Sequence, residues 1–301
     1  MASLGQIFDK LHLSFTQKGN KNKKIRQEKG ALQICQEQGG TMNVFQFQTL
    51  NVSNIKELAG FDIPQNAENL LKSAGQRFIA EQQIKQENLK NAIMDSHIEE
   101  IEEPNELDKD WFLKWMDIAQ GVSKENIQKM LSKIISGEIK KTGAFSLRTL
   151  EVLKNLSKEE LSIFQEFCNI SYSIPQFRDA LTCVICEPFG SPGDNSLEKF
   201  NLSYTNLTLL HDAGLIQKDL TTWREMKIPL LFNLPFTIGS ENLRLVSSVD
   251  TVESTPRHKI INFTKAGLEL RSILNLEKND EYLKDFIEWA KNTYKMNLAS
   301  D

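Results

Sequence analysis

Two cysteines three positions apart are the residues whose type and spacing most directly suggest chemistry. Cys183 and Cys186 form a single C-x-x-C pair, a spacing found in half of a zinc site or in a redox pair. A zinc site needs two further ligands, for which Cys168 and His211 are the nearby candidates. Because the sequence has no second C-x-x-C pair, we favour the alternative that these are buried cysteines of a strand.

The other residue types that support catalysis form no recognisable constellation. The histidines are scattered along the chain at His12, His97, His211 and His258. The sequence has neither a Walker-type loop nor a dinucleotide-binding glycine pattern, and EPFGSPGDNS indicates turns, not a phosphate-binding loop. We therefore predict no catalytic residue, no cofactor and no metal. An enzyme or toxin whose site assembles from distant residues stays an alternative.

Composition and charge limit the class of protein. The chain has 301 residues, 40% of them hydrophobic and 25% charged, which is typical of globular domains, and its net charge is −4. Nucleic-acid binding would therefore need a local basic patch. The four cysteines indicate reduced thiols, no apolar run approaches the about 18 residues of a membrane span, and the N-terminus lacks a secretory signal. We predict a cytoplasmic protein.

The first sixty residues predict three short elements. Residues 1–17 carry one apolar helical stripe, and this amphipathic helix packs on protein or lies on a membrane surface; we favour packing. Residues 18–60 predict a basic tether followed by a hairpin-like β segment around Gly39, which indicates self-assembly because isolated hairpins are marginal. The tether is a solvated linker or a phosphate-binding segment. Its basic residues are Lys18, Lys21, Lys23, Lys24, Arg26 and Lys29.

Helices predominate over the next hundred residues. Residues 61–104 predict a long polar helix and an acidic linker, and residues 105–156 predict a helical bundle. Asp108 or Asp110 can cap its first helix, Ser123 its second, and Ser146 precedes a short leucine-rich helix. Ser157 with Glu160 has the spacing of a capping box. The segment KTGAFSLRTLEVLKNLS therefore predicts a corner between helices.

This corner also carries a family resemblance. The run DWFLKWMDIAQGVSKENIQKMLSKIISGEIKKTGAFSLRTLEVLKNLSKEELSIFQEFC resembles a bacterial family of unknown function, with its G-E-I, G-x-F-S-L-R-T-L and L-S-x-E-E tracts. The paired helices before the corner are loosely similar to abortive-infection alpha-type proteins. The resemblance supplies no catalytic residues and implies a bacterial cytoplasmic protein associated with phage resistance. The matching residues, for which we expect a structural role, are Trp111, Gly137, Glu138, Ile139, Gly143, Phe145, Ser146, Leu147 and Thr149.

The last part of the chain predicts a small α+β module, in which Ser203 and Thr264 can each cap a helix and Gly214 can end the first of these helices before a strand. Residues 157–275 alternate helices and strands in the order of a winged helix, and residues 276–301 predict a C-terminal helix. The expected recognition helix, from Ser203 to Ala213, has no Lys or Arg, so Asn206 is its one residue suited to base readout. We therefore favour a winged-helix-like module that contacts protein over one that binds DNA.

Together these patterns predict a mainly α fold with a small β component: an N-terminal β-hairpin-like segment, a helical bundle and a C-terminal winged-helix-like α+β module. The expected function is non-enzymatic and depends on protein association or self-assembly, in the setting of phage resistance. The expected partner is a second copy or another protein, with no membrane span. A nucleic-acid-binding winged-helix regulator is the alternative.

Overall fold

The chain divides into two compact units, Met1–Gln83 and Ile84–Asp301. In the first unit, the described residues form the beginning of helix α3 (Glu68–Met94). The predicted elements of residues 1–17 and 18–60 lie outside the described residues and stay predictions. The computed structural model describes residues 68–94, 105, 107–174, 182–186, 197–217, 224–227, 234–247 and 257–299.

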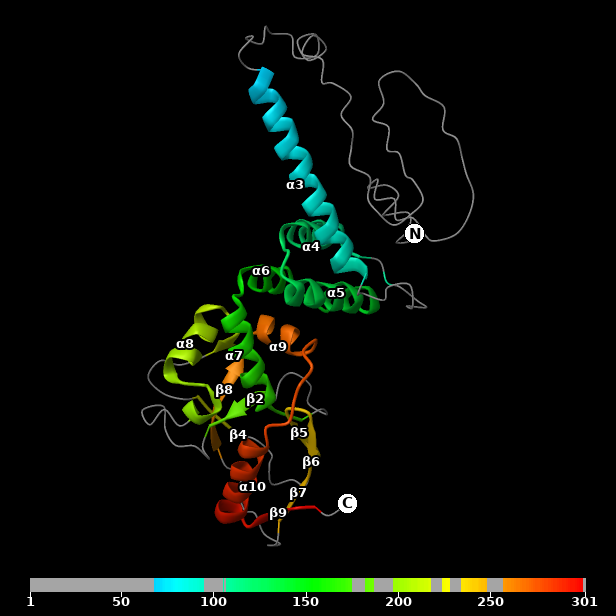
Figure 1. Cartoon of the computed structure of the whole chain (residues 1–301). Helices are drawn as coiled ribbons and strands as arrows, with labels where there is room; N and C mark the ends of the chain where they lie inside the picture. Colours follow the sequence, from blue (N-terminus) through cyan, green and yellow to red (C-terminus); the bar gives the residue numbers. More distant parts are fainter. Residues whose placement is uncertain are drawn as a thin grey trace. The chain divides into compact units, whose positions relative to one another are not determined.

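Four helices of the second unit follow one another: α4 (Lys109–Gly121), α5 (Glu125–Lys140), α6 (Leu147–Asn155) and α7 (Lys158–Asn169). Figure 1 shows α4, α5 and α6 lying together, with α7 leading from them toward the sheet. Each helix buries one apolar stripe; α4 packs on α5 and α6, whereas α7 packs on α8 (Tyr204–Asp212). Trp115 of α4 is buried, and its Nε1 donates a hydrogen bond to the Leu131 carbonyl at 3.1 Å.

Side-chain caps start most of the helices where the sequence predicts them. In each of four caps the side chain accepts a hydrogen bond from the backbone N–H three residues later. The four residues are Asp108, Ser157, Ser203 and Thr264. Ser157 and Glu160 complete the predicted capping box. The predicted cap of α5 by Ser123 is wrong, because α5 begins after Lys124, whose side chain makes no cap hydrogen bond.

Within the described residues, a seven-stranded antiparallel sheet follows the helices. The order of its strands is β3-β8-β2-β1-β5-β6, and β4 also pairs with β8, the longest strand. The strands are β1 (Tyr172–Ser173), β2 (Cys183–Ile185), β3 (Ile216–Gln217), β4 (Arg224–Lys227), β5 (Phe236–Ile238), β6 (Glu241–Leu243) and β8 (Arg257–Phe263).

Three helical segments accompany the sheet: η6 (Glu198–Phe200), α8 (Tyr204–Asp212) and α9 (Lys265–Arg271). Gly214, with φ of 76°, ends α8 and turns the chain into β3, as the sequence predicts. Figure 1 shows α7, α8 and α9 around the end of β8. Phe164 and Phe167 of α7 contact the ring of Phe263 of β8, with centroids 6.1 and 5.0 Å apart.

The last helix of the described residues is shorter than the predicted range of residues 276–301. Helix α10 (Asp280–Tyr294) ends at Lys295, whose φ of 55° is left-handed, and the chain then forms β9 (Met296–Leu298). Strand β9 pairs with β7 (Leu245–Ser247) in a second, two-stranded sheet. The hydroxyl of Tyr282 in α10 donates to the carbonyl of Ile185 in β2 at 3.0 Å, which fastens α10 to the main sheet.

The described residues confirm a mainly α fold with a small antiparallel β component. Among the helices that the structure describes, none combines the length and the apolar character needed to cross a bilayer.

Candidate functional site

The corner between α5 and α6 is built around a buried carboxylate. Glu138, near the end of α5, is 1% exposed, and its two oxygens accept hydrogen bonds from the backbone N–H groups of Gly143 and Phe145 at 2.6 and 2.9 Å. Gly143 takes a φ of 82°, which glycine adopts without strain. The acid and the glycine therefore fix the path of the loop between the two helices.

Phe145 makes two further contacts, one through its backbone carbonyl and one through its ring. Trp111 of α4 donates its Nε1 hydrogen bond to the Phe145 carbonyl at 2.7 Å, and both residues are buried. A Cβ atom at Gly137 would lie 2.6 Å from a carbon of the Phe145 ring, closer than atoms can approach. Position 137 therefore needs glycine for space, because a side chain there would displace the phenylalanine.

A second carboxylate caps α6 from a distant part of the chain. Glu269 of α9 accepts hydrogen bonds from the backbone N–H and hydroxyl of Ser146, at 2.7 and 3.1 Å, and from the hydroxyl of Thr149. Its side chain is 10% exposed and lies 3.7 Å from the ammonium of Lys265. A negative charge at a helix N-terminus satisfies free N–H groups and the helix dipole. Glu269 thus connects α9, which accompanies the sheet, to the start of α6.

The structure brings the predicted family residues together. Seven of them form the corner by the contacts above: Trp111, Gly137, Glu138, Gly143, Phe145, Ser146 and Thr149. Ile139 is buried, whereas Leu147, the first residue of α6, is 47% exposed. The corner therefore presents the first turn of α6 to solvent in a fixed position.

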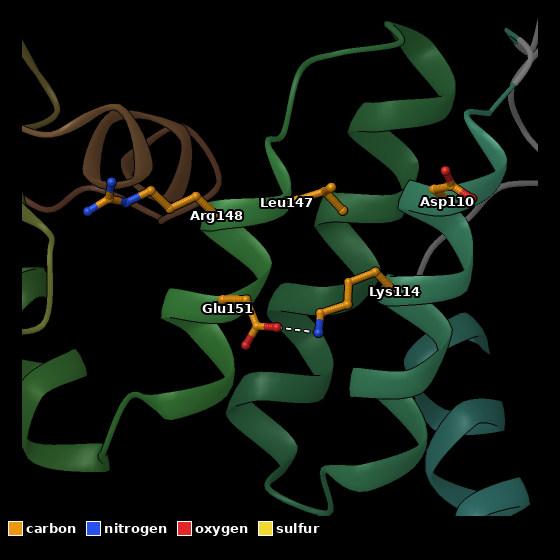
Figure 2. A pocket seen from close by; sticks show the side chains of 5 residues that line it. All are labelled: Asp110, Lys114, Leu147, Arg148 and Glu151. Carbon is orange, nitrogen blue, oxygen red and sulfur yellow. Dashed lines mark ion pairs between the residues drawn. The ribbon is translucent and has the colours of Figure 1, made fainter.

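Beside this turn lies an open groove between α4 and α6. Its volume is about 510 Å³. It is lined by Asp110, Lys114, Leu147, Arg148 and Glu151. Figure 2 shows the side chains of Lys114 and Glu151 meeting across the groove in an ion pair. This pair raises the pKa of Lys114 and lowers the pKa of Glu151. Lys and Glu side chains are ordinarily charged near neutral pH, so this pair places one positive and one negative charge at the centre of the groove.

The cysteines are placed where thiol chemistry is disfavoured. Cys168, Cys183 and Cys186 are buried, free thiols, and Cys183 lies in β2 as predicted. Burial raises the pKa of Cys183 to about 12, so its reactive thiolate form is scarce near neutral pH. Within the described ranges there is no group of three or more His, Cys, Asp or Glu residues suited to holding a metal ion.

The residues predicted to contact nucleic acid are placed as follows. The tether residues Lys18 to Lys29 lie outside the described residues. Asn206 lies in the first turn of α8, and its side-chain amide donates to the Asn201 carbonyl at 2.9 Å. The side chain of Asn206 therefore stabilises the turn before α8, which reduces its freedom to read a base edge.

Sequence reasoning did not find the groove or the role of Glu269. No local pattern in the sequence links Glu269 to Ser146, which lies 123 residues earlier.

Fold and groove define a mainly α-helical protein with a small antiparallel sheet and a charged, open groove between two helices. Residues 72–287 match the model of a family described as a protein of unknown function, DUF2806. Because the match covers more than half of the chain, the chain belongs to this family. Comparisons with curated proteins and with solved structures each gave no match.

Proposed function

We propose that this chain is a cytoplasmic, non-enzymatic protein that acts by association with protein, and first of all with copies of itself. One observation carries the proposal: large apolar side chains are exposed mainly on three helices. Among the described residues, seven such side chains are exposed, and five of them belong to α3, α4 and α6. The five are Leu70, Phe78, Ile84, Leu113 and Leu147.

The exposed residues of α3 support the same proposal. Leu70 and Phe78 are 64% and 62% exposed, and their spacing of eight residues leaves them within one face of the helix. Association with another protein would remove these two side chains from water.

The strand order supports a winged-helix-like module for residues 157–275. Strand β8 lies between β2 on one side and β3 with β4 on the other, and α8 directly precedes β3. This is the order of helix, strand, helix and wing hairpin in such modules. Helix α8 has no Lys or Arg, and its Tyr204 is exposed. These properties favour contact with protein, because nucleic-acid contacts depend on cations.

A nucleic-acid-binding regulator is the alternative function, which the winged-helix order favours. In that case the tether residues Lys18 to Lys29 would contribute phosphate contacts. Fluorescence anisotropy with labelled duplex DNA tests it: binding should weaken steeply with salt and on neutralisation of the tether lysines. No binding at low salt would exclude this alternative.

Size-exclusion chromatography coupled to light scattering tests the main proposal. The full chain should elute as a defined oligomer, with absorbance at two wavelengths showing no nucleic acid. A monomer at every micromolar concentration tested would contradict self-association. A monomer carrying nucleic acid would favour the alternative.

The resemblance to abortive-infection proteins supports phage resistance as the setting of this association. Bacteria that express the chain should then give fewer phage plaques than cells with an empty vector. Unchanged plaque counts across a broad panel of phages would argue against this setting.

A further inference from the structure

Charged side chains along one face of α4 and one face of α6 alternate in complementary order. Helix α4 presents acid, base, acid at spacings of four and three residues, and α6 presents base, acid, base at spacings of three. Residues three or four apart share one face of a helix. We call these six residues the α4–α6 face: Asp110, Lys114 and Asp117 on α4, and Arg148, Glu151 and Lys154 on α6. Its net charge is zero.

The central charges of this face are paired within the chain, and the outer ones are not. Lys114 and Glu151 form the ion pair across the groove. Figure 2 shows Asp110 on one side of this pair and Arg148 on the other. Within the described part of the chain, neither Asp110 nor Arg148 makes an ion pair, and both are exposed.

We propose that the α4–α6 face is a self-complementary interface between two copies of this chain, related by a two-fold axis that runs along the groove. This inference rests on the proposed function. Rotation about such an axis places α4 of one copy against α6 of the second copy. It leaves the position of each residue along the groove unchanged. Asp110 then faces Arg148 of the second copy, and Arg148 faces its Asp110, so that each copy satisfies the other's outer charges.

The charge order selects this arrangement over the other two-fold arrangement of the same face. An axis across the groove would lay α4 on α4 in reverse order, which brings Asp110 against Asp117 and Lys114 against Lys114. Like charges opposed across an interface are strongly unfavourable, whereas complementary charges fix register and speed association. The charge pattern of the α4–α6 face is therefore complementary to the same face of a second copy.

Apolar surface and rigidity support the same interface. Leu113 and Leu147, on the two helices of the face, are 41% and 47% exposed and would lose water contact on association. The first turn of α6, which carries Leu147 and Arg148, is already fixed by Glu269 and by the corner. Fixing the backbone that carries these two side chains before binding reduces the entropy lost on association.

Two charge reversals test this interface, because each should weaken association alone and a mixture of the two variants should restore it. In Arg148→Glu the new acid faces Asp110 of the second copy, and in Asp110→Arg the new base faces Arg148. We expect each variant alone to have a dissociation constant at least about tenfold higher than that of the parent chain. In an equimolar mixture every outer charge again meets its opposite, so the mixture should recover a heterodimer.

Sedimentation velocity of the full chains, alone and mixed, gives the readout, with Glu159→Arg as the matched control. Glu159 is exposed and lies in the first turn of α7, so it reproduces the helix-dipole cost of changing Asp110 without touching the face. Circular dichroism establishes that all variants are folded.

The outcomes separate this inference from the proposed function. Loss of association in both single variants, with recovery in the mixture, supports the interface. A parent chain that associates while both variants associate equally well overturns the interface but leaves protein association standing. A parent chain that is monomeric throughout overturns both. If both single variants lose association and their mixture does not regain it, the proposed interface is also overturned. That result indicates that the two charges contact a different partner surface.

Discussion

Replacing Glu138 by alanine tests whether one buried carboxylate determines the α5–α6 corner. The substitution removes the acceptor of two backbone N–H groups: that of Phe145, which is buried, and that of Gly143, which is partly buried. A buried donor left without an acceptor costs about 1–3 kcal/mol, and one that water reaches costs less. We therefore expect Glu138→Ala to lower the free energy of unfolding by about 2–4 kcal/mol.

Urea denaturation followed by tryptophan fluorescence measures this change. Trp111 reports on the corner directly, because its indole donates to the Phe145 carbonyl. Glu125→Ala is the matched control: Glu125 begins the same helix, but its exposed ion pair with Lys129 predicts a much smaller effect. If Glu138→Ala unfolds within about 0.5 kcal/mol of the parent chain, the corner does not depend on this carboxylate and the reasoning is refuted.

Three further perturbations follow from the same contacts. Gly137→Ala puts a methyl group 2.6 Å from the Phe145 ring, so it should lower the free energy of unfolding by about 1–3 kcal/mol; an unchanged melting temperature would contradict this contact. Glu269→Gln removes the charge at the N-terminus of α6 and should cost about 1 kcal/mol in urea denaturation, while equal stability would show that hydrogen bonding alone caps the helix. Burial raises the pKa of Cys183 from its ordinary 9.0 to about 12, so the folded chain favours the protonated thiol. This stabilisation is complete below pH 9 and is lost as pH rises from 9 to 12; Cys183→Ala should show a shallower decline, and parallel pH curves would contradict the shift.

Local sequence patterns predicted the helices well, because their signals lie within a few residues. The capping box of Ser157 and Glu160 and the cap by Thr264 each depend on a backbone N–H only three residues away. The apolar stripe of α5 likewise gives its buried face directly. At the start of α5 no side chain caps the helix, so the prediction of Ser123 from cap chemistry failed there.

The features that the sequence did not predict depend on long-range contacts. Strand β9 forms by pairing with β7, about fifty residues earlier, and three residues give no strand pattern of their own. The role of Glu269 depends on a fold that brings α9 to the N-terminus of α6. The candidate site also depends on long-range contacts. The family resemblance indicated the α5–α6 corner, but the groove forms only because α4 and α6 lie side by side in the fold.

Sedimentation velocity of the intact parent chain, over a range of micromolar concentrations and at low and high salt, tests the central claim most directly. Association through protein surfaces predicts an oligomer that forms as concentration rises, contains no nucleic acid, and weakens with salt because charges contribute to the contact. A single monomeric species at every concentration and salt would contradict it.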